Sequence, residues 1–267
     1  MSSCLAALRA RGGGGPPPGG GAPVWVLGIT PPGMVIAVRF NIYYKYMFSC
    51  PEAAMSFPAF FALAPTLTLH DPLAVFLGAS DSGDITYTYA DAVKLAGHSC
   101  PTVAGAWLML RHGLTRIYGN QIPQRGAIEV YMRDARDHGT TGVIAAIATL
   151  LTGAAPETGF GGIGARGRFA RRDLLHFDTP IGGLMGVRRR DTGQGVILDL
   201  DTARVPAGPQ MAALFPIVAT EGASADEHKR FGALWQERVE KMLTAHADDP
   251  ALVIVRAWDD KGTDAAA

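Results

Sequence analysis

Residues 98–119 read HSCPTVAGAWLMLRHGLTRIYG, and their pattern predicts a helix with clear ends. Apolar side chains recur at steps of four and three, as they do on one face of a helix. Pro101 suits the first helical position, and Gly119 suits the residue that follows the last turn. These ends place Cys100 at the N-cap. The apolar positions of this face are Val103, Trp107, Leu110, Leu114 and Ile117.

The predicted N-cap places His98 and Cys100 where their side chains can act at the same point. Pro101 disfavours helical backbone in the residue before it, so His98 and Cys100 are expected in extended chain, where side chains two residues apart point to the same side. A thiol at a helix N-terminus meets the positive end of the helix dipole, which favours the thiolate, the form that attacks substrates and binds metals. The alternative is that Cys100 is a small buried residue and His98 bonds a backbone carbonyl.

Outward from this helix, the sequence alternates between strand and helix patterns. Residues 140–153 are apolar almost all round, which suits either a deep core or the interface of a homodimer. Ser224 and Glu227 form a capping box that opens a late helix. Strand patterns occur at residues 85–89, at 126–132, on both sides of a turn at 191–195, and at 251–258. This mixture predicts an α+β fold, with a mixed or antiparallel sheet packed with helices in a single main domain.

The N-terminal stretch differs in composition from the rest of the chain. Residues 11–23 read RGGGGPPPGGGAP, a low-complexity sequence typical of disorder. Residues 1–54 are therefore expected to be a disordered extension, or a non-native region included by a misplaced start codon. On this interpretation Met55 opens the domain, which covers residues 55–267.

Net charge, cysteine content and the length of apolar runs argue against several classes of protein. The 267 residues include 24 basic and 24 acidic side chains, so the net charge is zero and binding of nucleic acid by charge alone is not expected. Three widely spaced cysteines, Cys4, Cys50 and Cys100, do not suit a secreted disulfide framework, which favours a cytoplasmic protein. No apolar run reaches the ~18 to 20 residues of a membrane span, so no membrane association is expected.

Three segments resemble the FmdE-like family, which is named after a component of formylmethanofuran dehydrogenase. GHSCPTVAGAWLMLRHGL at residues 97–114 resembles its opening motif, a histidine, a cysteine and a proline before a helix. GVIAAIATLLTGAAPETGFGGIG at 142–164 and VRRRDTGQGVILDL at 187–200 are similar to its apolar helix with a glycine-rich loop and to its hairpin. The resemblance implies an α+β domain with a metal, most simply zinc, bound at His98 and Cys100. Ala96 and Ala154 stand where the family has a further histidine and cysteine.

A third zinc ligand is expected, because a catalytic zinc usually has three protein ligands and an open position. His70 is the candidate, with Asp71 as an acceptor that could orient its imidazole. The alternative for His70 is a position at a helix N-terminus or a strand end near solvent. Asp81 or Asp84 could add an oxygen ligand, although their surroundings read more readily as a turn.

Three functions follow from these residues. The first is a metal-dependent enzyme or enzyme subunit acting on an unknown small molecule, with zinc at His98, Cys100 and His70. The second is an accessory protein that binds metal without turnover. The third is a metal-free thiol protein with Cys100 as its catalytic nucleophile. The sequence leaves open whether the protein is an enzyme.

The glycine-rich loop suggests a different kind of site. GFGGIG at residues 159–164 matches a dinucleotide-binding pattern, but an apolar helix precedes it where that fold requires a strand. Arginines follow directly, beside backbone that a ligand can approach closely. The loop is therefore either an anion site or a solvated surface segment. The arginines are Arg166, Arg168, Arg171 and Arg172.

Overall fold

The computed structural model describes residues 25–30, 34–39 and 57–258 and divides the chain into two units, residues 1–56 and 57–267. In the first unit, strand β1 (Trp25–Thr30) pairs antiparallel with β2 (Met34–Arg39). The rest of residues 1–54 lies outside the described residues. The expected extension and the domain start at Met55 therefore stay predictions.

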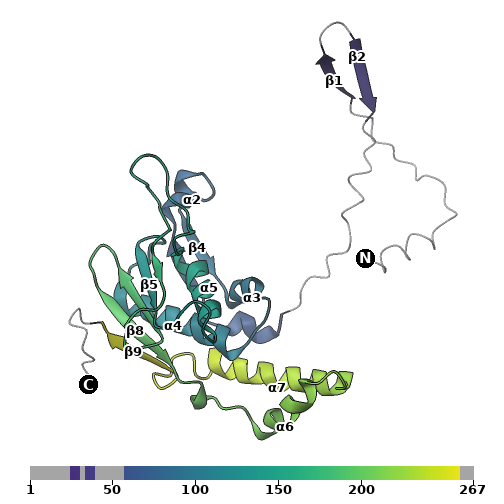
Figure 1. Ribbon diagram of the computed structural model, residues 1–267, viewed down its shortest axis with the longest axis vertical. Coiled ribbons are helices and arrows are strands. Elements are labelled where there is room, and N and C mark those ends of the chain that lie inside the picture. Colours follow the sequence, from purple (N-terminus) through teal and green to yellow (C-terminus); the bar gives the residue numbers. More distant parts are fainter. Residues whose placement is uncertain (1–24, 31–33, 40–56, 259–267) are drawn as a thin grey trace, which may run out of the picture. The chain divides into compact units, whose positions relative to one another are not determined.

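The second unit has the predicted α+β fold. Residues 57–258 form six α-helices, a five-stranded mixed sheet and a two-stranded hairpin, packed in one body (Figure 1). The hairpin consists of β3 (Leu67–His70) and β4 (Asp84–Tyr87). The helices are α2 (Pro72–Phe76), α3 (Tyr89–Ala96), α4 (Pro101–Tyr118), α5 (Thr141–Thr152), α6 (Pro209–Val218) and α7 (Ala225–Leu243), with short 3-10 turns at Ala59–Leu63 and Thr202–Arg204.

The sheet has the strand order β6, β5, β7, β8, β9. Strands β5 and β6 are parallel, and the other neighbours are antiparallel. The turn predicted at residues 191–195 joins β7 to β8, which confirms the hairpin. The strands are β5 (Ile128–Met132), β6 (Leu175–His176), β7 (Met185–Arg189), β8 (Gly195–Leu200) and β9 (Val253–Ala257).

Helix α4 begins and ends where the sequence predicts, with Cys100 as N-cap and Gly119 as C-cap. It is buried on more than the predicted face, because the sheet lies along one side and α3, α5 and α7 contact its other sides (Figure 1). A methyl group at Gly105 would overlap the side chain of Leu200. This helical glycine therefore lets α4 lie close against the sheet.

The other two predicted helices are also confirmed. Helix α5 fills the interior, with Ile147 and Leu151 fully buried, which agrees with the deep-core alternative. The homodimer stays a prediction. Helix α7 opens with the capping box of Ser224 and Glu227. No helix in the described ranges has the length and apolar character needed to span a bilayer.

Candidate functional site

The structure places the two predicted ligands near the start of α4 in different surroundings. Cys100 is half-buried, and its Sγ accepts a hydrogen bond from the Val103 amide at 3.4 Å. His98 is exposed, and its Nδ1 lies 2.9 Å from the Ala96 carbonyl oxygen. The N-cap geometry predicted for the cysteine is present, and the histidine bonds a backbone carbonyl as in the alternative interpretation.

His70 lies at the end of β3, where its Nδ1 is 3.1 Å from Asp84 Oδ1. The carboxylate that orients this imidazole is therefore Asp84, and not the expected Asp71, which pairs with arginines. Within residues 57–258, no three His, Cys, Asp or Glu side chains form a group that could hold a metal ion. The structure thus does not bring His70, His98 and Cys100 together as a metal site, and zinc binding stays a prediction.

The chain just before Cys100 is held by hydrogen bonds from two other helices. The Ser99 carbonyl accepts hydrogen bonds from Trp235 Nε1 at 3.0 Å and from Gln236 Nε2 at 3.1 Å, both on α7. The Ser99 hydroxyl lies 3.0 Å from the Tyr89 hydroxyl on α3. Burial raises the pKa of Tyr89. These bonds fix the position of Cys100 at the helix terminus.

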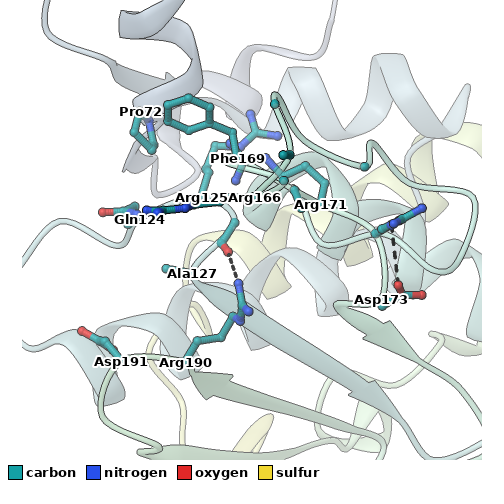
Figure 2. Close-up of a pocket in the computed structure, with 17 residues that line it drawn as sticks. Pro72, Gln124, Arg125, Ala127, Arg166, Phe169, Arg171, Asp173, Arg190 and Asp191 are labelled. Carbon is teal, nitrogen blue, oxygen red and sulfur yellow. Dashed lines mark hydrogen bonds and ion pairs between the residues drawn. The ribbon is translucent and has the colours of Figure 1, made fainter.

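A hollow of about 1000 Å³, which we call the arginine pocket, lies next to the start of α2 (Figure 2). Its walls come from residues 124–127, from the glycine-rich loop between 161 and 173, and from residues 190–191, together with Pro72. The lining includes five arginines and two aspartates. The arginines are Arg125, Arg166, Arg171, Arg172 and Arg190.

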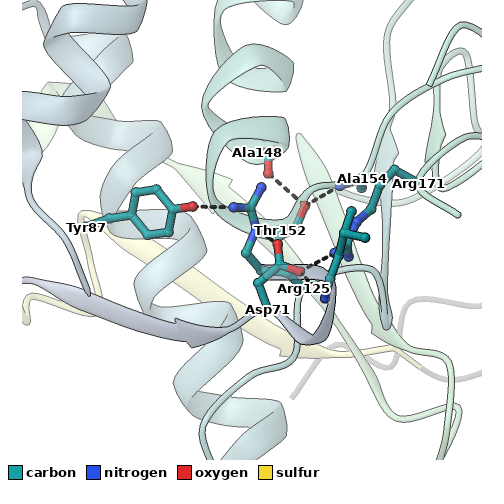
Figure 3. A network of polar contacts seen from close by, with 8 residues as sticks. Asp71, Tyr87, Arg125, Ala148, Thr152, Ala154 and Arg171 are labelled. Carbon is teal, nitrogen blue, oxygen red and sulfur yellow. Dashed lines mark hydrogen bonds and ion pairs between the residues drawn. The ribbon is translucent and has the colours of Figure 1, made fainter. Parts of the chain in front are cut away.

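Asp71 anchors the inner side of the arginine pocket by holding two arginines (Figure 3). Its Oδ1 lies 2.6 Å from Arg171 Nη2, and its Oδ2 lies 3.5 Å from Arg125 Nε. The side chains of Asp71, Arg171 and Arg125 are only 11%, 9% and 17% exposed. Arg125 also donates a hydrogen bond to the Tyr87 hydroxyl. One buried carboxylate thus faces two guanidinium groups.

Glycine is required where the chain passes this buried group. Gly126 has φ of +79°, and a methyl group there would overlap the guanidinium of Arg171. The Gly126 amide donates to the Thr152 carbonyl at 2.9 Å, which ties this segment to the end of α5. Thr152 Oγ1 donates to the Ala148 carbonyl at 2.7 Å and accepts from the Ala154 amide at 3.1 Å. Gly126 therefore has a packing function that its position before a strand did not reveal.

The outer arginines of the pocket are more exposed. Arg166 makes no ion pair with any of the described residues, and its side chain is in solvent. Arg172 Nε lies 3.9 Å from Asp173 Oδ2. Arg190 Nε lies 3.8 Å from Glu129 Oε1, and its Nη1 donates to the Gly126 carbonyl. These side chains are available to a ligand, because surface ion pairs of this kind are weak.

The glycine-rich loop is ordered by its own backbone. Ile163 and Arg168 exchange two backbone hydrogen bonds, of 2.7 and 3.0 Å, around a tight turn. Helix α5 precedes the loop, and the next element after it is the short strand β6. This order differs from the strand and helix that flank a dinucleotide-binding loop, as the sequence predicts.

Of the arginine pocket, sequence reasoning identified the loop arginines and missed Arg125, Arg190 and the pairing of Asp71.

Comparison of the sequence with protein-family models and with curated proteins finds no match. The resemblance to the FmdE-like family therefore stays an expectation drawn from the motifs.

Proposed function

We propose that the protein binds a small phosphate- or carboxylate-bearing molecule in the arginine pocket. The observation that carries this proposal is the sharing of one buried carboxylate by two arginines that line a hollow. Asp71 neutralises only one of these two charges, so one positive charge stays without compensation on the largely buried arginine side chains. A guanidinium group binds phosphate or carboxylate through two parallel hydrogen bonds, and such charge-assisted bonds are the strong ones.

The charges around the pocket favour an anion. Beyond the pair that shares Asp71, Arg166 has no ion-pair partner among the described residues. Arg172 lies near Asp173, and Arg190 lies near Glu129. Asp191 is paired at 2.6 Å with Arg189, which does not line the hollow. The carboxylates beside the five pocket arginines are those of Asp71, Asp173 and Glu129. Five positive and three negative charges therefore leave an excess of two positive charges. Such a concentration of charge in a concave site raises the local concentration of anions.

Glycine backbone makes the pocket accessible to a bulky anion. Gly161, Gly164 and Gly167 line it, so no side chain separates a ligand from the loop backbone there. Gly164 has φ of +70° and a methyl group on it would meet nothing within 4 Å, so the wall is open at that point. An oxyanion can approach this backbone while the loop arginines contact it from the same wall, and Arg125 and Arg190 contact it from the other walls.

The test is isothermal titration calorimetry of the full chain with inorganic phosphate and with citrate, at low ionic strength. Arg166→Ala should weaken binding by about 3- to 10-fold, which corresponds to roughly 1 kcal/mol for one exposed charged hydrogen bond. Arg230→Ala is the matched control, because Arg230 is exposed on α7 and does not line the hollow. Tighter binding of phosphate or of citrate identifies the anionic group.

Two results would overturn the proposal. One is that neither anion binds at millimolar concentration. The other is that Arg166→Ala and Arg230→Ala change the affinity equally, which would show a diffuse charge effect in place of a pocket. Binding should also weaken as salt is added, because salt screens exposed charges.

Cys100 supports a second proposal, separate from the arginine pocket. Its Sγ accepts an amide hydrogen bond at the N-terminus of an 18-residue helix. We infer that Cys100 acts as a thiol nucleophile or, with His98, as a zinc ligand of a metal-dependent enzyme, enzyme subunit or accessory protein. Iodoacetamide labelling with and without zinc tests this role.

A further inference from the structure

A second hollow of about 400 Å³ adjoins the arginine pocket. Pro72 and Phe169 line both hollows, so the two are neighbours across these side chains. The other walls of the second hollow come from α2, from the end of β3 and from the turn before β4. The remaining lining residues are His70, Val75, Phe76, Asp81, Ser82 and Arg168.

Two aromatic rings form one wall of this second hollow. Phe76 is 52% exposed, and its ring centroid lies 5.2 Å from that of Phe169, with the planes tilted by 40°. The Arg168 guanidinium lies 5.6 Å from the Phe76 centroid and 4.8 Å from the Phe169 centroid. Aromatic rings and a guanidinium plane are the surfaces on which a planar ring stacks.

The backbone at Phe169 gives independent support. Its φ of +64° lies in the left-handed region, which a bulky side chain rarely adopts. Such strained conformations concentrate at ligand sites, where the surrounding structure holds them. Here the conformation belongs to a residue that lines both hollows. Figure 2 shows its ring beside Pro72 and above the arginines.

We propose that the ligand of the arginine pocket carries a planar ring, which lies against Phe76 and Phe169 while its anionic group contacts the arginines. The ligand class is an aryl or heteroaryl phosphate or carboxylate, including nucleotides. His70, oriented by Asp84, and Ser82 line the same hollow and can hydrogen-bond polar atoms at the edge of the ring. This inference rests on the proposed function, because it adds a ring subsite to the same anion site.

The experiment compares ligands that differ only in the ring. Calorimetry of the full chain measures phenyl phosphate against methyl phosphate, and adenosine 5′-monophosphate against ribose 5-phosphate. The first pair places the ring next to the anion, and the second places it a sugar away. In at least one pair, the ring should tighten binding roughly tenfold, as stacking on an aromatic side chain does.

Two variants test whether the planar ring binds at Phe76. Phe76→Ala should remove the advantage of the ring and leave the affinity for methyl phosphate and ribose 5-phosphate unchanged. Phe215→Ala is the matched control, because Phe215 is 56% exposed on α6 and lines neither hollow. It should leave all four affinities unchanged. Circular dichroism and a thermal unfolding curve establish that both variants are folded.

The possible failures are distinguishable. If ligands with and without the planar ring bind equally, the ring subsite is refuted and the anion site stands. If the ring advantage survives Phe76→Ala, the ring binds elsewhere and the inference is again wrong. If none of the four ligands binds, the proposed function fails and the ring subsite fails with it.

Discussion

Asp71→Asn should destabilise the folded protein by about 3 kcal/mol. Breaking a buried ion pair by removing one partner costs about 3–5 kcal/mol, because the other charge is left without compensation. Asp71 pairs with two arginines, and the side chains of all three are at most 17% exposed. We take the lower end of the range because this slight exposure lets water reach the guanidinium groups.

The substitution to asparagine isolates the effect of charge. Asp71 is also the N-cap of α2, where its Oδ1 accepts the Leu73 amide at 3.0 Å. Asparagine keeps an oxygen for this bond, whereas alanine loses it. Asp71→Ala should therefore cost about 1 kcal/mol more than Asp71→Asn, the usual effect of deleting a cap.

The assay is urea unfolding followed by tryptophan fluorescence, with the free energy of unfolding obtained by linear extrapolation. Asp173→Asn is the control, because Asp173 is 68% exposed and lies 3.9 Å from Arg172. It should change the free energy of unfolding by less than about 0.5 kcal/mol. If Asp71→Asn costs no more than Asp173→Asn, the argument from the shared buried carboxylate is refuted.

The same variant links stability to binding. In Asp71→Asn, Arg125 and Arg171 lack their carboxylate, so a bound phosphate can compensate both charges. Added phosphate should therefore raise the free energy of unfolding of the variant by more than that of the wild type, since a ligand stabilises the state that it binds. Equal stabilisation would show that the two arginines do not contact the anion.

Three further predictions concern Gly126, Tyr131 and the predicted zinc. Gly126→Ala should lower the unfolding temperature more than Gly97→Ala, because φ is +79° and +76° at the two sites but only the first methyl group overlaps Arg171; calorimetry showing equal losses would contradict this. Burial and the hydrogen bond to Glu129 raise the pKa of Tyr131 to about 12, so the folded protein keeps a proton that the unfolded chain loses above pH ~10. Stability should fall as pH rises from there to about 12, and less steeply in Tyr131→Phe; identical slopes would argue against the shift. If zinc binds as the motifs imply, plasma mass spectrometry should find it in the wild type and not in Cys100→Ala.

Local sequence was sufficient to predict the elements whose ends depend on near neighbours. Cys100 and Pro101 begin α4 because an N-cap acceptor and a proline suit a helix start, and the capping box of Ser224 and Glu227 opens α7 in the same way. The turn at 191–195 joins β7 to β8 for an equally local reason. Each of these features involves residues within a few positions of one another, so spacing alone carries the information.

The partners of the charged residues, in contrast, became known only from the folded chain. The loop arginines were evident from the sequence, but Asp71, assigned to orient His70, instead pairs with Arg171, 100 residues away. His70 meets Asp84 because β3 and β4 pair in a register that sets these two residues opposite each other. Partner choice among charges depends on which side chains folding brings together at low exposure, where the interaction is strong. Residue spacing describes only near neighbours, so it cannot report these pairings.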